Sequence, residues 1–199
     1  GPGSPLAAFV ADHALDVAAR LGENDRLLVD VGHGPIAHAI VRAGIDRGAK
    51  VRAIARSEAD ASSLAALGAI VEIGESDASA RVSVLVSNAS GSRARSLTQR
   101  LESGGRFVDL RPPGRSADFD ADPVVVGFNQ TASRIDALAL AESDPDLAGQ
   151  MIRRNLDRTN PMSEIGDEPL RFPISEVDRA LRFLSMGRAR AGLVVEFAE

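Results

Sequence analysis

A glycine-rich segment follows the first apolar run of the chain and could hold a phosphate group. The run Arg26–Val31 is typical of a buried strand, and the six residues that follow it, Gly32–Ala37, read G-x-G-x-x-A. Small residues let the backbone approach a diphosphate. Pro35 suits the first turn of a helix, whose free N–H groups and dipole attract an anion. The segment predicts either a dinucleotide-binding loop or a loop that only keeps a tight turn.

Residues after other expected strands narrow the choice of ligand. Arg56 follows the strand Val51–Ala55, where the ribose of a dinucleotide would lie, and an arginine there favours the 2′-phosphate of NADP over NAD. A solvated surface arginine is the alternative. His33 could contact a diphosphate, but without a neighbouring cluster of acids it also fits a solvated loop position. The candidate cofactor-binding residues are Gly32, His33, Gly34, Pro35, Ile36, Arg56, Ser57 and Asn88.

A second class of function fits the same loop. Leu28–Gly34 also resembles the first motif of class I methyltransferases, and Gly104–Phe107 resembles a later turn of those enzymes. They usually place an acid after the second strand to hold the ribose of S-adenosylmethionine, whereas this chain has Arg56. A SAM-dependent methyltransferase therefore stays an alternative.

Strands and helices alternate along the chain, which predicts an α/β fold with a Rossmann-like, doubly wound parallel sheet and helices on both faces. Ser57 with Asp60 has the spacing of a capping box at the start of a helix. We expect helices over 6–21, 35–48, 57–67, 92–102, 133–142 and 146–156, and strands over 26–31, 51–55, 69–73, 82–86, 107–110, 124–128, 170–174 and 193–197.

The composition excludes several kinds of site and partner. The chain has no cysteine, so a disulfide framework, a thiolate metal site and a cysteine nucleophile are ruled out. A net charge of -5 and 4% aromatic residues argue against nucleic acid. No apolar run approaches the roughly 20 residues of a membrane span, so we expect a cytoplasmic protein. Lys50 is the one lysine and there is no tyrosine, which leaves little for acid–base catalysis.

The closing segment carries a resemblance to a known family. Leu170–Leu184 and Arg188–Val195 resemble the end of medium-chain dehydrogenases/reductases, while Gly104–Asp109 and Val124–Asn129 resemble their fifth and sixth strands. The similarity spans Pro5–Glu199 and is greatest to enoylreductase domains of modular polyketide synthases. It implies the nucleotide-binding half of an enzyme that reduces an acyl-thioester double bond with NADPH.

Departures from the family's pattern imply lost chemistry. Pro35 and Ala37 replace glycine-loop residues, Asp60 stands where the family has a lysine, and Arg111-Pro112 replaces a Gly-Lys pair. Lys50 precedes the second strand, at the edge of the sheet opposite the ligand site. We therefore expect NADPH to bind weakly or not at all, and we assign no catalytic residue and no metal ligand.

Our first hypothesis is a degenerate enoylreductase-like domain with a structural or docking role, and the alternative is a working NADPH-binding half. Gly1–Ser4 reads as an expression-tag scar, and residues 5–199 as a single domain whose substrate-binding half is largely absent. The expected partners are neighbouring domains of a synthase. A second copy could also pair through the apolar strand around Val125, which reads as an edge of the sheet.

Overall fold

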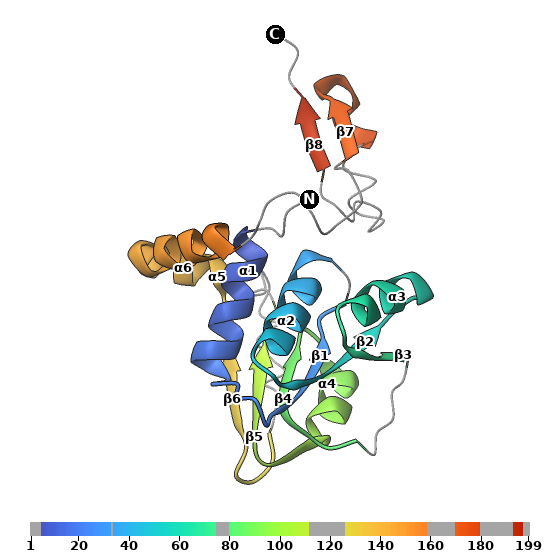
Figure 1. Cartoon of the computed structure of the whole chain (residues 1–199), viewed down its shortest axis with the longest axis vertical. Helices are drawn as coiled ribbons and strands as arrows, with labels where there is room; N and C mark the ends of the chain where they lie inside the picture. Colours follow the sequence, from blue (N-terminus) through green and yellow to red (C-terminus); the bar gives the residue numbers. More distant parts are fainter. Residues whose placement is uncertain are drawn as a thin grey trace.

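The computed structural model describes residues 5–32, 34–74, 80–111, 126–158, 170–179 and 193–196. Its centre is a six-stranded sheet with the order β3-β2-β1-β4-β5-β6, and every neighbouring pair of strands is parallel (Figure 1). The expected fold class is therefore confirmed. The strands are β1 (Arg26–Asp30), β2 (Lys50–Ala55), β3 (Ile70–Ile73), β4 (Val82–Ser87), β5 (Leu101–Asp109) and β6 (Thr131–Arg134).

Helices cover both faces of this sheet. Successive side chains of a strand point to opposite faces, and in the central strands the side chains on both faces are apolar. In β1, Val29 packs into the cluster that contains α2 (Pro35–Asp46) and α3 (Glu58–Ala66), whereas Leu28 packs toward α4 (Gly91–Thr98). The buried pattern of β4, in which all six residues are buried, matches a strand covered on both faces.

The amino-terminal helix departs from its expected geometry. It begins as α1 (Pro5–Asp12) and continues as a π-helix, η1 (His13–Ala18). Arg47 of the α2 carboxyl end donates hydrogen bonds to Asp12 at 2.8 Å and Asp16 at 2.7 Å, which ties both segments to α2. These two carboxylates also raise the pKa of Arg47, chiefly through the hydrogen bond to Asp16.

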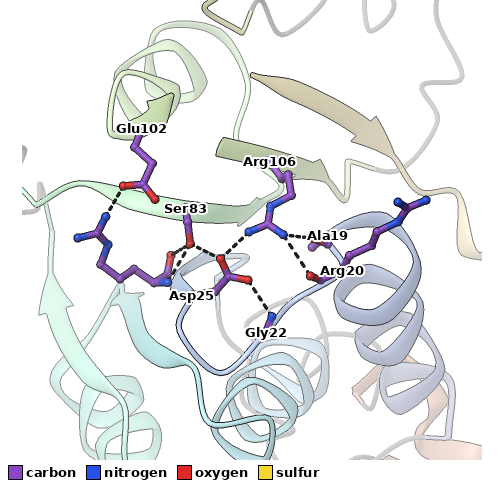
Figure 2. A network of polar contacts seen from close by, with 8 residues as sticks. Ala19, Arg20, Gly22, Asp25, Ser83, Glu102 and Arg106 are labelled. Atoms are coloured by element: carbon purple, nitrogen blue, oxygen red, sulfur yellow. Dashed lines mark hydrogen bonds and ion pairs between the residues drawn. The ribbon is translucent and has the colours of Figure 1, made fainter. Parts of the chain in front are cut away.

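A polar network at the amino ends of β1, β4 and β5 holds the end of η1 against the sheet (Figure 2). Arg106 donates to the carbonyl oxygens of Ala19 at 2.8 Å and Arg20 at 3.1 Å, and it also pairs with Asp25. The hydroxyl of Ser83 donates to the same Asp25 carboxylate at 2.6 Å. Burial alone would raise the pKa of Asp25, but these hydrogen bonds and the Arg106 charge outweigh burial and lower it.

Several expected boundaries were wrong. The helix expected from residue 133 starts only at Ala137, because residues 133 and 134 belong to a strand. The helix predicted to run to residue 102 ends at Thr98, and β5 begins at Leu101 instead of residue 107. The strand expected over 124–128 is not the sixth strand, because β6 is Thr131–Arg134. Val125 lies outside the described residues, and 126–130 form a turn.

The remaining described elements lie after β6. Helices α5 (Ala137–Ser143) and α6 (Pro145–Arg158) follow, and Ala148 packs with Phe9 and Val10 of α1. β7 (Leu170–Pro173) and β8 (Leu193–Glu196) form a separate parallel pair, with the short 3₁₀ turn η2 (Ile174–Glu176) after β7. None of the helices described is long and apolar enough to cross a membrane.

Candidate functional site

The strand order identifies the carboxyl edge of the sheet between β1 and β4 as the place where a fold of this kind has its ligand crevice. The chain adds β2 and β3 on one side of β1 and β4 to β6 on the other, so the strand order reverses between β1 and β4. Ligands of open α/β sheets bind at such a reversal, outside the carboxyl ends of the strands. Asp30 and Ser87, the last residues of β1 and β4, are register partners there.

The glycine loop leaves β1 at this crevice. Gly32 has φ 78° and Gly34 has φ 110°, backbone conformations that favour glycine over residues with a Cβ. Gly34 precedes α2, which starts at Pro35 as expected. Ile36 follows on the first turn with 39% of its surface exposed. His33 lies outside the described residues.

The predicted Arg56 is brought onto the glycine loop. A Cβ built on Gly32 would come within 3.3 Å of the guanidinium carbon of Arg56. The side chain therefore lies against the glycine backbone, and a larger residue at Gly32 would push it away. Arg56 places a positive charge where an anionic group of a nucleotide would approach the loop.

A histidine that the sequence did not single out connects this loop to α3. The Nδ1 atom of His38 lies 2.9 Å from the carbonyl oxygen of Gly34, and its Nε2 lies 2.8 Å from the hydroxyl of Ser63. The carbonyl can only accept, so Nδ1 carries a proton and donates to it. His38 thus fixes the loop from the side of the helix that follows it.

The other predicted site residues have structural partners. Ser57 caps α3, since its hydroxyl oxygen accepts a hydrogen bond from the Asp60 N–H at 3.2 Å, and this confirms the predicted cap. The Asn88 side chain donates to the carbonyl oxygen of Val31 at 3.3 Å, which places it at the base of the glycine loop.

An ion pair joins the carboxyl end of β1 to α4. Arg93 of α4 reaches Asp30 with two hydrogen bonds of 2.8 and 2.9 Å, in a bidentate arrangement. The Asp30 side chain is only 2% exposed, whereas that of Arg93 is 43% exposed. Ser87 lies 3.4 Å from the same carboxylate. The buried acid that ends β1, just before the glycine loop, is thus paired within the chain itself.

A second buried carboxylate ends β5. Asp109 accepts hydrogen bonds from the Arg111 side chain at 2.8 to 3.0 Å and from Arg134 at 3.0 Å. Burial alone would raise the pKa of Asp109, but the Arg111 and Arg134 hydrogen bonds outweigh it and lower the pKa. Such a carboxylate stays ionised and paired at neutral pH.

Sequence reasoning missed the residues that form these ion pairs. Arg93 and Asp30 are 63 positions apart, and Arg93 is one of many arginines in an arginine-rich chain. A buried strand that ends in an acid was the one available signal, because such a carboxylate must find a cation. Asp30 and Asp109 both follow that pattern.

The described site holds charges and hydrogen-bond donors but no arrangement of nucleophile and base. No group of three or more His, Asp or Glu residues that could hold a metal ion occurs within the described ranges. The arrangement can accept an anion through Arg56 and the amino end of α2, provided that the Asp30–Arg93 pair leaves room.

No protein-family sequence model matches the chain, and no curated protein matches it in sequence. Solved structures do match. The crystal structure of the CurK enoyl reductase aligns with this chain with a TM-score of 0.74 and 20% identity, over 98% of this chain and 61% of the CurK chain. The nucleotide-binding subdomain of the enoylreductase domain of PpsC from Mycobacterium tuberculosis aligns with a TM-score of 0.65 and 21% identity over 79% of this chain and 97% of the subdomain.

An alcohol dehydrogenase superfamily protein from Novosphingobium aromaticivorans aligns with a TM-score of 0.68 and 20% identity over 92% of this chain and 59% of the other. This chain therefore spans about three fifths of the CurK enzyme and of the superfamily protein, and nearly all of the PpsC subdomain. The chain has the fold of the nucleotide-binding half of enoyl reductases and of the medium-chain dehydrogenase/reductase superfamily.

Proposed function

We propose that this chain is an enoylreductase-like domain of a polyketide synthase that no longer catalyses reduction and serves a structural or docking role beside neighbouring domains. The likeness to enoyl reductases supports the class of domain. The observation that supports the proposed loss of function is the Asp30–Arg93 ion pair, which lies at the carboxyl end of β1, where the fold would hold a dinucleotide.

The free energy needed to separate Asp30 from Arg93 opposes nucleotide binding. A diphosphate in the crevice would have to separate Arg93 from Asp30 or lie beside the Asp30 carboxylate. Separating an exposed pair costs under about 1 kcal/mol, whereas separating a buried pair costs about 3–5 kcal/mol. With one partner buried and the other 43% exposed, the cost lies between these limits. A cost of about 3 kcal/mol would weaken binding roughly 150-fold.

The glycine loop adds to this effect. Pro35 has no N–H to donate to a phosphate, and Ala37 is only 2% exposed, so its methyl group is committed to packing α2 on the sheet. Asp60, with its carboxylate bonded to the Ser57 hydroxyl at 2.7 Å, serves the cap of α3 and would repel a nearby phosphate.

A working NADPH-binding half is the second candidate, and the position of Arg56 favours it. Its guanidinium lies against Gly32, next to the amino end of α2, where an NADP phosphate would find both a charge and free N–H groups. If NADPH binds, Arg56 would hold it and the nicotinamide would supply the hydride.

Calorimetric titration with NADPH distinguishes the two candidates. We expect a dissociation constant weaker than about 10 μM, which corresponds to about 7 kcal/mol. Tighter binding that is lost in Arg56→Ala, but kept in the control Lys50→Ala at the opposite edge, would establish the second candidate and refute the first.

A paired variant tests the observation itself. Asp30→Asn with Arg93→Ala removes both charges from the crevice, so we expect NADPH to bind more tightly than to the unaltered chain. Circular dichroism and the melting temperature would verify that the variant is folded. Unchanged binding in a folded variant would mean that the ion pair is not what limits the nucleotide.

A further inference from the structure

A pocket of about 500 Å³ lies at the β6 edge of the sheet, two strands away from the β1–β4 crevice. The wall formed by η1 contributes His13, Val17 and Ala18, and the opposite side is formed by β6 and Ile135. Its volume is within the range of pockets that hold small organic ligands. The site is independent of the nucleotide crevice and of the function proposed above.

The wall of this pocket has two unusual backbone features. The π-helix η1 closes with a hydrogen bond from the Ala19 N–H to the carbonyl oxygen of Ala14 at 2.9 Å. Single π-helical turns are rare and are frequent at functional sites. Immediately afterwards, Arg20 has φ 48°, a conformation that non-glycine residues seldom adopt. Both features disfavour the folded chain locally, and both shape the same pocket.

Two buried nitrogen atoms of the lining residues lack a hydrogen-bond partner. They are Nδ1 of His13 and Nε of Arg106. The other guanidinium nitrogens of Arg106 are used by Asp25 and by the carbonyl oxygens of Ala19 and Arg20, as Figure 2 shows. Buried polar groups of native proteins are nearly always paired, so the wall of this pocket carries two groups whose hydrogen bonding the described residues leave incomplete.

The polar side chains that line the pocket can all donate hydrogen bonds, although one of them, Arg134, is already paired with Asp109. The guanidinium of Arg20 extends away from the network in Figure 2 and bonds no described residue. The hydroxyls of Thr131 and Ser133, which alternate along β6, make no hydrogen bond within the described part of the chain. No aspartate or glutamate is among the lining residues, and Val17, Ala18 and Ile135 supply apolar surface.

We propose that this pocket binds a small organic carboxylate with a short aliphatic body. The carboxylate would receive the charge-assisted hydrogen bonds of Arg20 and the hydroxyl bonds of Thr131 and Ser133. The aliphatic part would lie on Val17 and Ile135. Burial lowers the pKa of His13, so its ring is neutral at pH 7 and the charge that attracts the carboxylate comes from Arg20.

Hexanoate is a suitable probe, followed through the NMR signals of the Val17 and Ile135 methyl groups and the His13 ring. We expect saturable shifts of these signals with hexanoate, and at least about tenfold weaker binding of hexanamide, which lacks the charge. Inorganic phosphate, which lacks the aliphatic body, should bind more weakly than hexanoate.

Arg20→Gly is the decisive variant, because glycine adopts the φ of this position without strain and the fold should be retained. It should weaken hexanoate at least about tenfold while leaving the melting temperature equal or higher. The matched control is Arg26→Gln, a cation of the same polar network that pairs with Glu102 and does not line the pocket. Equal hexanoate binding by wild type and Arg20→Gly, or no shift at Val17 and Ile135, would overturn the proposal.

Discussion

The Asp109 carboxylate should respond very differently to the loss of its two arginines. The Arg111 side chain is 4% exposed and that of Arg134 is 41% exposed, although both bond the same oxygen atom. Removing one member of a buried pair costs about 3–5 kcal/mol, because the other charge is left uncompensated. Exposed pairs contribute about 0–1 kcal/mol. We therefore expect Asp109→Asn and Arg111→Ala each to cost about 3 kcal/mol, and Arg134→Ala less than about 1 kcal/mol.

Equilibrium unfolding in urea measures these differences. A loss of about 3 kcal/mol is a large fraction of the roughly 5–15 kcal/mol that stabilises a typical domain. The double variant Asp109→Asn/Arg111→Met should recover much of the loss, since no buried charge remains. If Arg134→Ala costs as much as Arg111→Ala, or the double variant is no better than Asp109→Asn, burial does not decide the strength of this cluster.

The same carboxylate predicts how acid affects stability. The folded-state pKa of Asp109 is lowered below the ordinary value of 3.8, so its stabilisation is complete above that pH and is lost as the pH falls further. The stability of wild type should thus fall below about pH 4, and Asp109→Asn should lose this part of the slope. An identical slope in both proteins would assign acid sensitivity to other groups, such as Asp25, whose pKa is also lowered.

Four further results are expected. Ser57→Ala should cost about 1 kcal/mol in urea unfolding, because it removes the cap of α3; an unchanged midpoint would contradict this. Gly44→Ala should cost about 1–3 kcal/mol despite better helix propensity, because the new methyl would lie 2.7 Å from Leu27 Cδ2; a stabilised variant would show that Leu27 moves aside easily. NADPH consumption with a crotonyl thioester should not exceed the control without protein; turnover that survives Lys50→Ala would reveal a missed catalytic group. A homodimer was expected through an edge strand around Val125, but the edge strand of the structure is Thr131–Arg134; sedimentation at micromolar concentration should detect a dimer paired through that edge, and a monomer throughout would refute it.

The central strands could be predicted from the sequence and the edge strand could not. β1, β2 and β4 are apolar runs buried by helices on both faces, so hydrophobicity alone locates them within a residue or two. The sixth strand, Thr131–Arg134, is short and polar, with three of its four residues exposed, and carries no such pattern. The run 124–128 is more apolar, and the sequence therefore predicts the strand there.

The candidate site shows the same division between local and distant information. The glycine loop and the Ser57 cap depend on neighbouring residues, whose types and spacing state the geometry. The π-helix over His13–Ala18 was not predicted, because no local pattern in the sequence distinguishes it from the α-helix before it. The pairing of Arg93 with Asp30 depends on how α4 packs beside β1, which no local pattern contains.

The use of arginine for nearly every cation limits what the carboxyl edge can do chemically. Asp30 pairs with Arg93 and Asp109 pairs with Arg111, each in a bidentate arrangement that suits arginine. Arginine does not release its proton near neutral pH, and a carboxylate with a lowered pKa, as at Asp109, is a poor proton acceptor. Both ion pairs therefore stabilise the ends of β1 and β5 without supplying an acid or a base. The urea series therefore tests the ion pair that ends β5, whereas the NADPH titration tests the ion pair that ends β1.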